Sequence, residues 1–186
     1  MKRTIIAISR QYGSGGRTIG RKVAERLSIP FVDGNTAIPD FHEREGVLKE
    51  PVIGFMEGAA ENYAISDAMI KRFKAEIKEA ASSSCVIVGL AATYILRNDP
   101  DLITIFIKAP IDSRVERAVN IYGIGKRKAE KYVNRMDTAR SSFFEYVSEM
   151  KWGMARNYNL TIDSSVTGID GAVETIISFL ERAGRL

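Results

Sequence analysis

The fold of this chain is decided near its start, by the sequence IIAISRQYGSGGRTIG at residues 5–20. An apolar run enters a glycine-rich loop, and a segment with helical spacing of apolar residues leaves it. A loop of this kind directs several backbone N–H groups and the positive end of a helix toward one spot. Because such a spot attracts anions, the stretch predicts a phosphate-binding loop.

The loop is close to the regular P-loop pattern G-x-x-x-x-G-K-[ST], with two departures. Gln11 stands where the pattern has its first glycine, and Arg17 stands where it has lysine. Arginine keeps the positive charge but spreads it over a wide planar fork, which can hold phosphate in a bidentate way. The departures therefore alter the geometry of the expected contact and preserve its charge.

Each loop residue has a role in the phosphate-binding interpretation. Three glycines permit backbone angles and a close approach that side chains would prevent. These glycines are Gly13, Gly15 and Gly16. Ser14 is small enough for its N–H to join the same nest. Arg17 would face the β- and γ-phosphates of a nucleoside triphosphate as a catalytic group, and the hydroxyl of Thr18 would bind Mg²⁺.

Two other interpretations of the loop compete with this one. Asp33 follows Gly13 by about twenty residues, where a dinucleotide fold places a ribose-binding acid. However, Thr18 stands where the fingerprint G-x-G-x-x-G needs its last glycine. A plain strand-to-helix turn explains one or two of the glycines but not three followed by a basic residue and a hydroxyl.

Composition limits the class of protein. The chain has 186 residues, of which 45% are hydrophobic and 27% charged, and this predicts one globular domain over 1–186. No apolar run reaches about 18 residues, so no membrane contact is expected. The start lacks a secretory signal, and a single cysteine fits a reducing cytoplasm. The net charge of +4 is spread along the chain, which favours small phosphorylated ligands over nucleic acid.

Strands and helices alternate in the apolar pattern. Strands are expected at 4–9, 30–33, 85–88, 103–108 and 160–162. Helices are expected at 18–27, 64–81, 91–97, 111–121, 126–148 and 168–180. Short apolar strands separated by helices are typical of an α/β fold in which helices cover both faces of a parallel sheet. The segments 34–63 and 122–157 are expected to be mobile appendages of the same domain.

Taken in order, these motifs resemble those of the cytidylate kinase-like family, relatives of the P-loop nucleoside monophosphate kinases. The resemblance begins at ISRQYGSGGR, residues 8–17, where that family also has arginine in place of lysine. The later shared motifs are PFVD at 30–33, VIVG at 86–89, YILR at 94–97, FIKAP at 106–110, DTAR at 137–140 and LTIDSS at 160–165.

The resemblance implies a three-layer P-loop kinase-type fold, with an acceptor-binding segment at 34–63 and a helical lid at 122–157. It implies ATP and Mg²⁺ as cofactors, and transfer of the γ-phosphate to a nucleoside monophosphate or similar small acceptor. Arg140 and Arg135 would be catalytic arms of the lid that reach the transferring phosphate.

Two further arginines resemble those that precede the lid in this family. Arg114 and Arg117 lie one helical turn apart and share a face, so both would contact the nucleotide. Asp33 is a candidate substrate-binding or base residue on the acceptor side. Its competing interpretation is a cap or turn aspartate beside Gly34.

One departure from the family concerns the acceptor. The family usually has arginine after the glycine that ends the strand at 85–88, and an aspartate three residues later. This chain has Leu90 and Thr93 at those positions. Leucine cannot bind phosphate and threonine cannot replace a carboxylate, so the sequence leaves the identity of the acceptor open. It does not specify the oligomeric state either. A nucleotide-binding module without efficient catalysis and a kinase for a non-nucleotide metabolite are the alternative functions.

Overall fold

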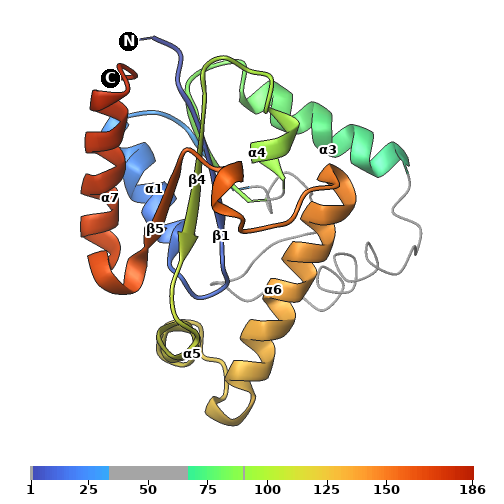
Figure 1. The fold of residues 1–186 in the computed structure, drawn as a ribbon, viewed down its shortest axis with the longest axis vertical. Coiled ribbons are helices and arrows are strands. Elements are labelled where there is room, and N and C mark those ends of the chain that lie inside the picture. The colour runs from blue at the N-terminus through green and yellow to red at the C-terminus, as the bar shows by residue number, and fades with distance from the viewer. Residues whose placement is uncertain (1, 34–66, 90) are drawn as a thin grey trace.

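The computed structural model of this protein describes residues 2–33, 67–89 and 91–186. Its centre is a sheet of five strands in the order β2-β3-β1-β4-β5 (Figure 1). The strands are Ile5–Arg10 (β1), Phe31–Asp33 (β2), Cys85–Val88 (β3), Leu102–Lys108 (β4) and Leu160–Asp163 (β5). Every pairing is parallel, so the carboxyl ends of the strands meet at one edge, away from the two chain termini (Figure 1).

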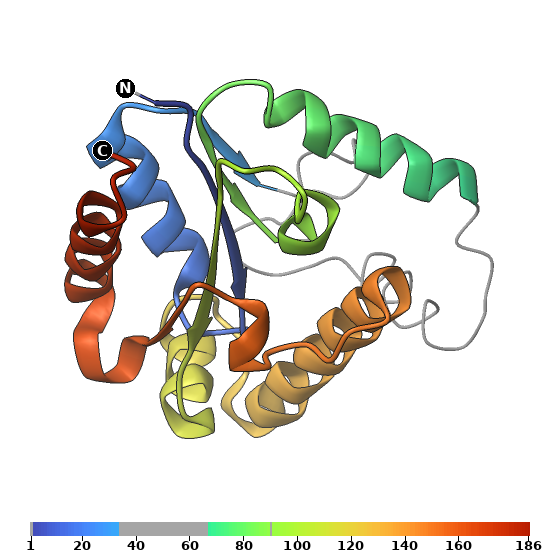
Figure 2. The same ribbon diagram turned by 45° about the horizontal axis from the view of Figure 1, so that its top comes forward.

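Helices cover both faces of this sheet, which confirms the predicted three-layer α/β fold (Figure 2). They are α1 (Gly16–Leu27), α3 (Asp67–Ala80), α4 (Ala92–Ile95), α5 (Ile111–Asn120), α6 (Lys126–Ser148) and α7 (Ser164–Arg182), with a short 3₁₀ turn η1 (Ala155–Asn157). α1 and α7 lie on one face, and α3, α4 and α6 lie on the other. No helix in the described ranges is both long enough and apolar enough to cross a bilayer.

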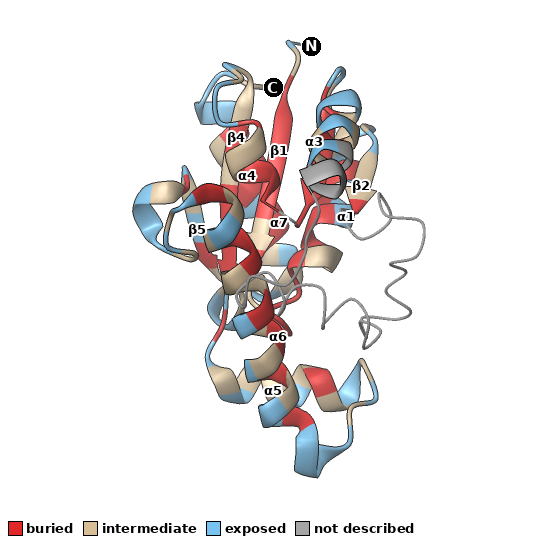
Figure 3. Cartoon of the chain, turned by 90° about the vertical axis from the view of Figure 1, so that its right-hand side faces the viewer, coloured by how far each residue is buried: buried red, intermediate tan, exposed pale blue. Residues whose placement is uncertain are grey.

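The central strand β1 shows why the sheet is covered on both sides. Ile5 and Ala7 join the core cluster that faces α3, α4 and α6, whereas Ile6 and Ile8 join the cluster that faces α1 and α7. Alternate side chains of a strand point to opposite faces, so a run of apolar residues needs a cover on each. Figure 3 shows the resulting buried centre.

The acceptor-binding segment expected at 34–63, and Leu90, which departs from the family pattern, lie outside the described residues. The helix expected at 168–180 is longer in the structure, because α7 begins at Ser164 and has a kink at Gly168 (φ 66°, ψ −179°). Asp163 starts this helix by accepting a hydrogen bond from the Ser165 backbone N–H at 3.1 Å.

Part of the predicted lid belongs to the core. α6 spans the bounds expected for a helix at 126–148, and its buried face includes Val133, Met136 and Phe143. These side chains pack in the same cluster as Ile5 of β1. α6 is therefore packed into the core through these side chains, whereas the expected mobility of the segment 122–157 stays a prediction.

Candidate functional site

The glycine-rich loop joins the end of β1 to the first turn of α1. Gly13 and Gly15 have positive φ angles of 78° and 77°. A Cβ atom on Gly13 would lie 2.6 Å from the carbonyl oxygen of Arg114, and one on Gly16 would lie 2.6 Å from Cβ of Arg10. Both the backbone angle and the lack of space explain why side chains are absent here.

The residues around the glycines hold the loop from within. Gln11, at the position of the first P-loop glycine, accepts a hydrogen bond from Ala109 N–H through Oε1 at 3.1 Å. Ser14 donates its N–H to the Gln11 carbonyl at 3.3 Å and its hydroxyl to the same oxygen at 2.8 Å. The structure thus directs the Ser14 N–H into the loop, whereas the sequence interpretation directed it toward phosphate.

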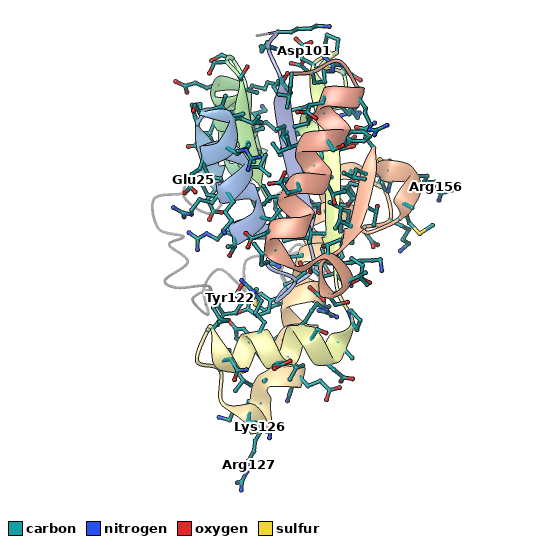
Figure 4. The ribbon with its side chains drawn as sticks, turned by 90° about the vertical axis from the view of Figure 1, so that its left-hand side faces the viewer. Glu25, Asp101, Tyr122, Lys126, Arg127 and Arg156 are labelled. Atoms are coloured by element: carbon teal, nitrogen blue, oxygen red, sulfur yellow. The ribbon has the colours of Figure 1, made fainter. Side chains whose placement is uncertain are left out.

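A cavity of about 410 Å³ opens beside this loop at the carboxyl edge of the sheet. Its lining consists of Arg10, Gln11, Tyr12, Gly13, Gly15, Gly16, Arg17, Thr18, Arg21, Ile121, Tyr122 and Arg140. Four of these are arginines, and among these lining residues none is acidic. The cavity also meets the positive end of α1, and Figure 4 shows Tyr122 between that end and α5. The arrangement favours a ligand with several negative charges.

Arg17 and Asp33, two of the predicted site residues, are brought together by β2. Arg17 Nε lies 2.7 Å from Asp33 Oδ2. The Asp33 side chain is only 3% exposed, whereas that of Arg17 is 28% exposed. A guanidinium carries five N–H donors in a planar fork, so a contact at Nε is compatible with phosphate binding through its terminal nitrogens.

Thr18 lies in the first turn of α1 and is one of the residues that line the cavity. Arg117 Nη2 donates to Thr18 Oγ1 at 3.3 Å, and Arg117 Nε donates to the Tyr122 hydroxyl at 3.5 Å. Arg117 therefore lies at the border of the loop but is not among the residues that line the cavity, and its contact with the nucleotide stays a prediction.

The residues around the loop offer few oxygen ligands for Mg²⁺. Within the described part of the chain, no group of three His, Cys, Asp or Glu side chains could hold a metal ion by itself. Mg²⁺ in phosphoryl-transfer sites is held by one or two protein ligands together with substrate phosphates and water. The single hydroxyl of Thr18 beside a phosphate-sized cradle fits that mode.

Arg114 has a different place from the one that the resemblance implies. It is buried beneath the loop and is absent from the lining of the cavity. Its Nη1 lies 2.5 Å from Asp137 Oδ2 and 3.2 Å from the Tyr12 carbonyl oxygen. Its Nε donates to the Ala109 carbonyl at 2.9 Å. The structure thus gives Arg114 backbone partners on two segments.

The two predicted lid arginines are placed differently from one another. Arg140 lines the cavity, with its guanidinium carbon 5.3 Å from the centre of the Tyr12 ring. Its Nη1 also donates to the Arg10 carbonyl at 3.5 Å. Arg135 is half-buried on α6 and is not among the lining residues.

Sequence reasoning missed Arg10, and it gave no location for Thr93. Arg10 ends β1, is nearly buried, and places Nη1 so that a Cβ on Gly89 would lie 2.5 Å away. The available signal was a basic residue at the last position of an apolar strand, directly before the glycine loop. Thr93 lines a second cavity, of about 270 Å³, on another part of the molecule.

Comparison with known sequences gives a consistent family. The model of the cytidylate kinase-like family matches residues 5–166. A cytidylate kinase from Pyrobaculum calidifontis is 23% identical over 176 residues, which cover 95% of this chain and 92% of the relative. A cytidylate kinase from Pyrobaculum neutrophilum is 33% identical over 113 residues, which cover 61% of this chain and 58% of the relative.

Solved structures share the fold. An uncharacterized protein from Eubacterium ventriosum matches with a TM-score of 0.72 and 27% identity, covering 96% of this chain and 99% of that one. A shikimate kinase from Bacteroides thetaiotaomicron matches with a TM-score of 0.59 and 16% identity, covering 96% and 98%, and at this identity it shows the fold alone. The family match extends over most of the chain and includes the glycine loop, the cavity arginines and α6, and the chain belongs to the cytidylate kinase-like family.

Proposed function

We propose that this protein transfers the γ-phosphoryl group of ATP, with Mg²⁺, to a nucleoside monophosphate or a similar small acceptor. The observation that carries the proposal is the meeting of three features in one cavity. These are the glycine loop, the N-terminus of α1 and four arginine side chains. Phosphoryl transfer depends on positioning and on neutralising phosphate charge, which such a site can do.

The donor phosphates would bind at the loop. Gly13, Gly15 and Gly16 line the cavity without side chains, and the first turn of α1 adds its N–H groups. Arg17 extends from that same turn and would hold the β- and γ-phosphates. Thr18 would hold Mg²⁺, which neutralises phosphate charge when it is bound.

The transferring group would lie between arginines from different parts of the chain. Arg17 comes from α1, whereas Arg140 comes from α6, and both line the cavity. Positive groups on two sides of a transferring phosphoryl group stabilise the charge that develops on its equatorial oxygens. Arg135, which does not line the cavity, would act only after a movement of α6, and its catalytic role is the less supported of the two.

Asp33 would contribute on the acceptor side. Its carboxylate ends β2, next to Arg17, so it lies beside the donor-binding turn and at the same sheet edge as the cavity. A carboxylate there can accept a hydrogen bond from a hydroxyl or amino group of the acceptor. The ion pair with Arg17 would orient it for that purpose.

A kinase for a non-nucleotide metabolite is the second candidate, and one observation favours it. Thr93, at the position where the family usually has an acceptor-binding aspartate, lines the other cavity. A threonine hydroxyl also lacks the carboxylate that the family uses for its acceptor contact. A test of acceptors should therefore include hydroxylated metabolites as well as nucleoside monophosphates.

The direct test is ADP release, measured with each common nucleoside monophosphate and with a panel of small hydroxy acids and sugars. We expect turnover with at least one acceptor in the presence of ATP and Mg²⁺. Arg17→Ala should lower kcat by about 10²-fold or more, the usual scale for an electrostatic stabiliser of the transition state. Arg26→Ala is the matched control because Arg26 lies near the other end of α1, with its side chain 57% exposed.

The binding arm separates catalysis from binding. ATP with Mg²⁺ at about 100 times its Kd should stabilise the fold by about 2.7 kcal/mol. Stabilisation without turnover of any acceptor would support the binding-module alternative. If millimolar ATP and GTP both leave the melting temperature unchanged, the phosphate-loop proposal fails.

A further inference from the structure

The ion pair between Arg114 and Asp137 lies under the phosphate loop and outside the cavity lining. We propose that this pair is a positioning device, which holds Tyr12 and α6 in register. In this role Arg114 acts on nucleotide binding through the backbone of Tyr12 and does not touch phosphate. The inference rests on the proposed function for its nucleotide readout, and it makes a separate prediction about the loop itself.

The pair forms hydrogen bonds with both the N–H and the carbonyl group of Tyr12. Tyr12 N–H donates to Asp137 Oδ1 at 2.7 Å, and the Tyr12 carbonyl accepts from Arg114 Nη1 at 3.2 Å. Arg114 Nη1 and Asp137 Oδ2, 2.5 Å apart, close the ring of contacts. Tyr12 directly precedes Gly13, so its orientation determines the direction in which the loop leaves β1.

Arg114 also connects the loop to the start of α5. Its Nε donates to the Ala109 carbonyl at 2.9 Å, just before that helix begins. Its own backbone carbonyl lies so close to Gly13 that a Cβ there would be 2.6 Å away. The same residue therefore bears on the loop through its guanidinium and through its main chain.

Asp137 lies on the same helix as Arg140, which lines the cavity. It precedes Arg140 by one turn of α6, so both side chains lie on one side of the helix. Arg140 lies over the Tyr12 ring, 5.3 Å from its centre, and donates to the Arg10 carbonyl. A shift of α6 relative to Tyr12 would therefore move the Arg140 guanidinium relative to the phosphate loop.

The chemistry of a buried pair makes this mechanism testable. Removing one partner leaves an uncompensated charge, whereas removing both leaves none. The effects of the two single changes should therefore be strongly non-additive. Asp137→Asn is the sharper change, because the amide oxygen can still accept from Tyr12 N–H while the charge that faces Arg114 is lost.

The two possible roles of Arg114 predict opposite signs for Asp137→Asn. If the pair acts only through its charge, removing the negative charge of Asp137 near an anion site should tighten nucleotide binding. If the pair positions Tyr12, the same change should weaken binding, because the loop loses its orientation. The experiment is calorimetric titration with a non-hydrolysable ATP analogue and Mg²⁺, on wild type, Asp137→Asn, Arg114→Gln and the double variant. Each protein is first shown by urea unfolding to be fully folded at the temperature of titration.

We expect each single variant to bind about tenfold more weakly or worse, since small misplacements in such sites cost up to 10²-fold. The double variant should bind no more weakly than the worse single variant. Arg114→Lys should fail to rescue, because one ammonium cannot reproduce the guanidinium fork that reaches Ala109 and Tyr12. Lys22→Gln and Asp170→Asn are the controls, since they break an exposed ion pair between α1 and α7. Wild-type or tighter binding by Asp137→Asn, or rescue by Arg114→Lys, would overturn the inference.

A readout without nucleotide separates this inference from the proposed function. Amide hydrogen exchange at residues 12–18 should accelerate in Asp137→Asn relative to the strands of the sheet. Unchanged exchange there would refute the positioning role. If wild type fails to bind the ATP analogue, the proposed function fails, and the exchange result alone decides the role of the pair.

Discussion

Replacing Gly13 by alanine tests whether the loop needs its glycines for conformation, for space or for both. Gly13 has a φ angle of 78°, and an added Cβ would lie 2.6 Å from the Arg114 carbonyl oxygen and 3.0 Å from its Cα. Gly123 has a similar φ angle of 70°, but a Cβ there meets nothing within 4 Å. Gly123→Ala is therefore a matched control that isolates the cost of the backbone angle.

The magnitude follows from three contributions. The left-handed conformation costs a residue with a side chain about 1–2 kcal/mol. Overlap with a packed neighbour adds about 1–3 kcal/mol. Lower entropy of the unfolded chain returns about 0.4–1 kcal/mol. Gly123→Ala should therefore lose about 0–1.6 kcal/mol of unfolding free energy, and Gly13→Ala about 1–4.6 kcal/mol, with the overlap of about 1–3 kcal/mol as the difference between them.

Urea unfolding measures these two losses, and a second titration with ATP and Mg²⁺ measures the function of the loop. At about 100 times Kd a ligand stabilises wild type by about 2.7 kcal/mol, and a tenfold loss of affinity would reduce this to about 1.4 kcal/mol. We expect at least that reduction in Gly13→Ala and none in Gly123→Ala. Equal stability of the two variants would refute the close approach to Arg114. Full nucleotide stabilisation in Gly13→Ala would refute the phosphate-binding role of the loop.

Three further predictions concern the rest of the fold. Burial raises the pKa of the Cys85 thiol to about 11, so a thiol reagent at about pH 8 should modify it only as the protein unfolds, and rapid labelling of the native state would contradict this. The hydrogen bond from Lys108 lowers the pKa of Asp163 below its ordinary 3.8, so its contribution to stability is present above that value and lost as pH falls through the folded pKa. The melting temperatures of wild type and Asp163→Asn should accordingly differ at about pH 7 and converge at about pH 2.5, and a constant difference would exclude this linkage. Met136→Ala should lose about 2–5 kcal/mol in urea unfolding because Met136 is fully buried, whereas Met154→Ala, at a side chain 43% exposed in the native state, should change stability by less than about 0.5 kcal/mol.

The sheet could be predicted from the sequence because its strands are short apolar runs between helical patterns. The run at 85–88 matches β3, and the predicted helix at 126–148 matches α6. The departures have local causes that periodicity does not register. Asp163 caps α7 five residues before the glycine at which the helix was expected to start.

The partners of the site residues could not be predicted in the same way. Arg114 and Arg117 are equivalent by spacing on one helix, yet Arg114 is turned to Asp137 and Arg117 to Thr18. This choice depends on α6, which follows later in the chain. Arg10 directly follows the strand expected at 4–9, and its position in the cavity depends on how the loop and β3 pass beside it.

The sequence by itself determined the fold class, and it predicts that the loop binds anions. Both follow from local properties: the alternation of strands with helices, and a run of glycines at a helix start. Only the tertiary structure decided which charged groups meet. It paired Arg17 in the first turn of α1 with Asp33 at the end of β2, placed Arg140 at the cavity and buried Arg114 beneath the loop. The physical reason is that a local pattern sets a residue's conformation, whereas its charge partner is supplied by segments that packing brings from elsewhere in the chain.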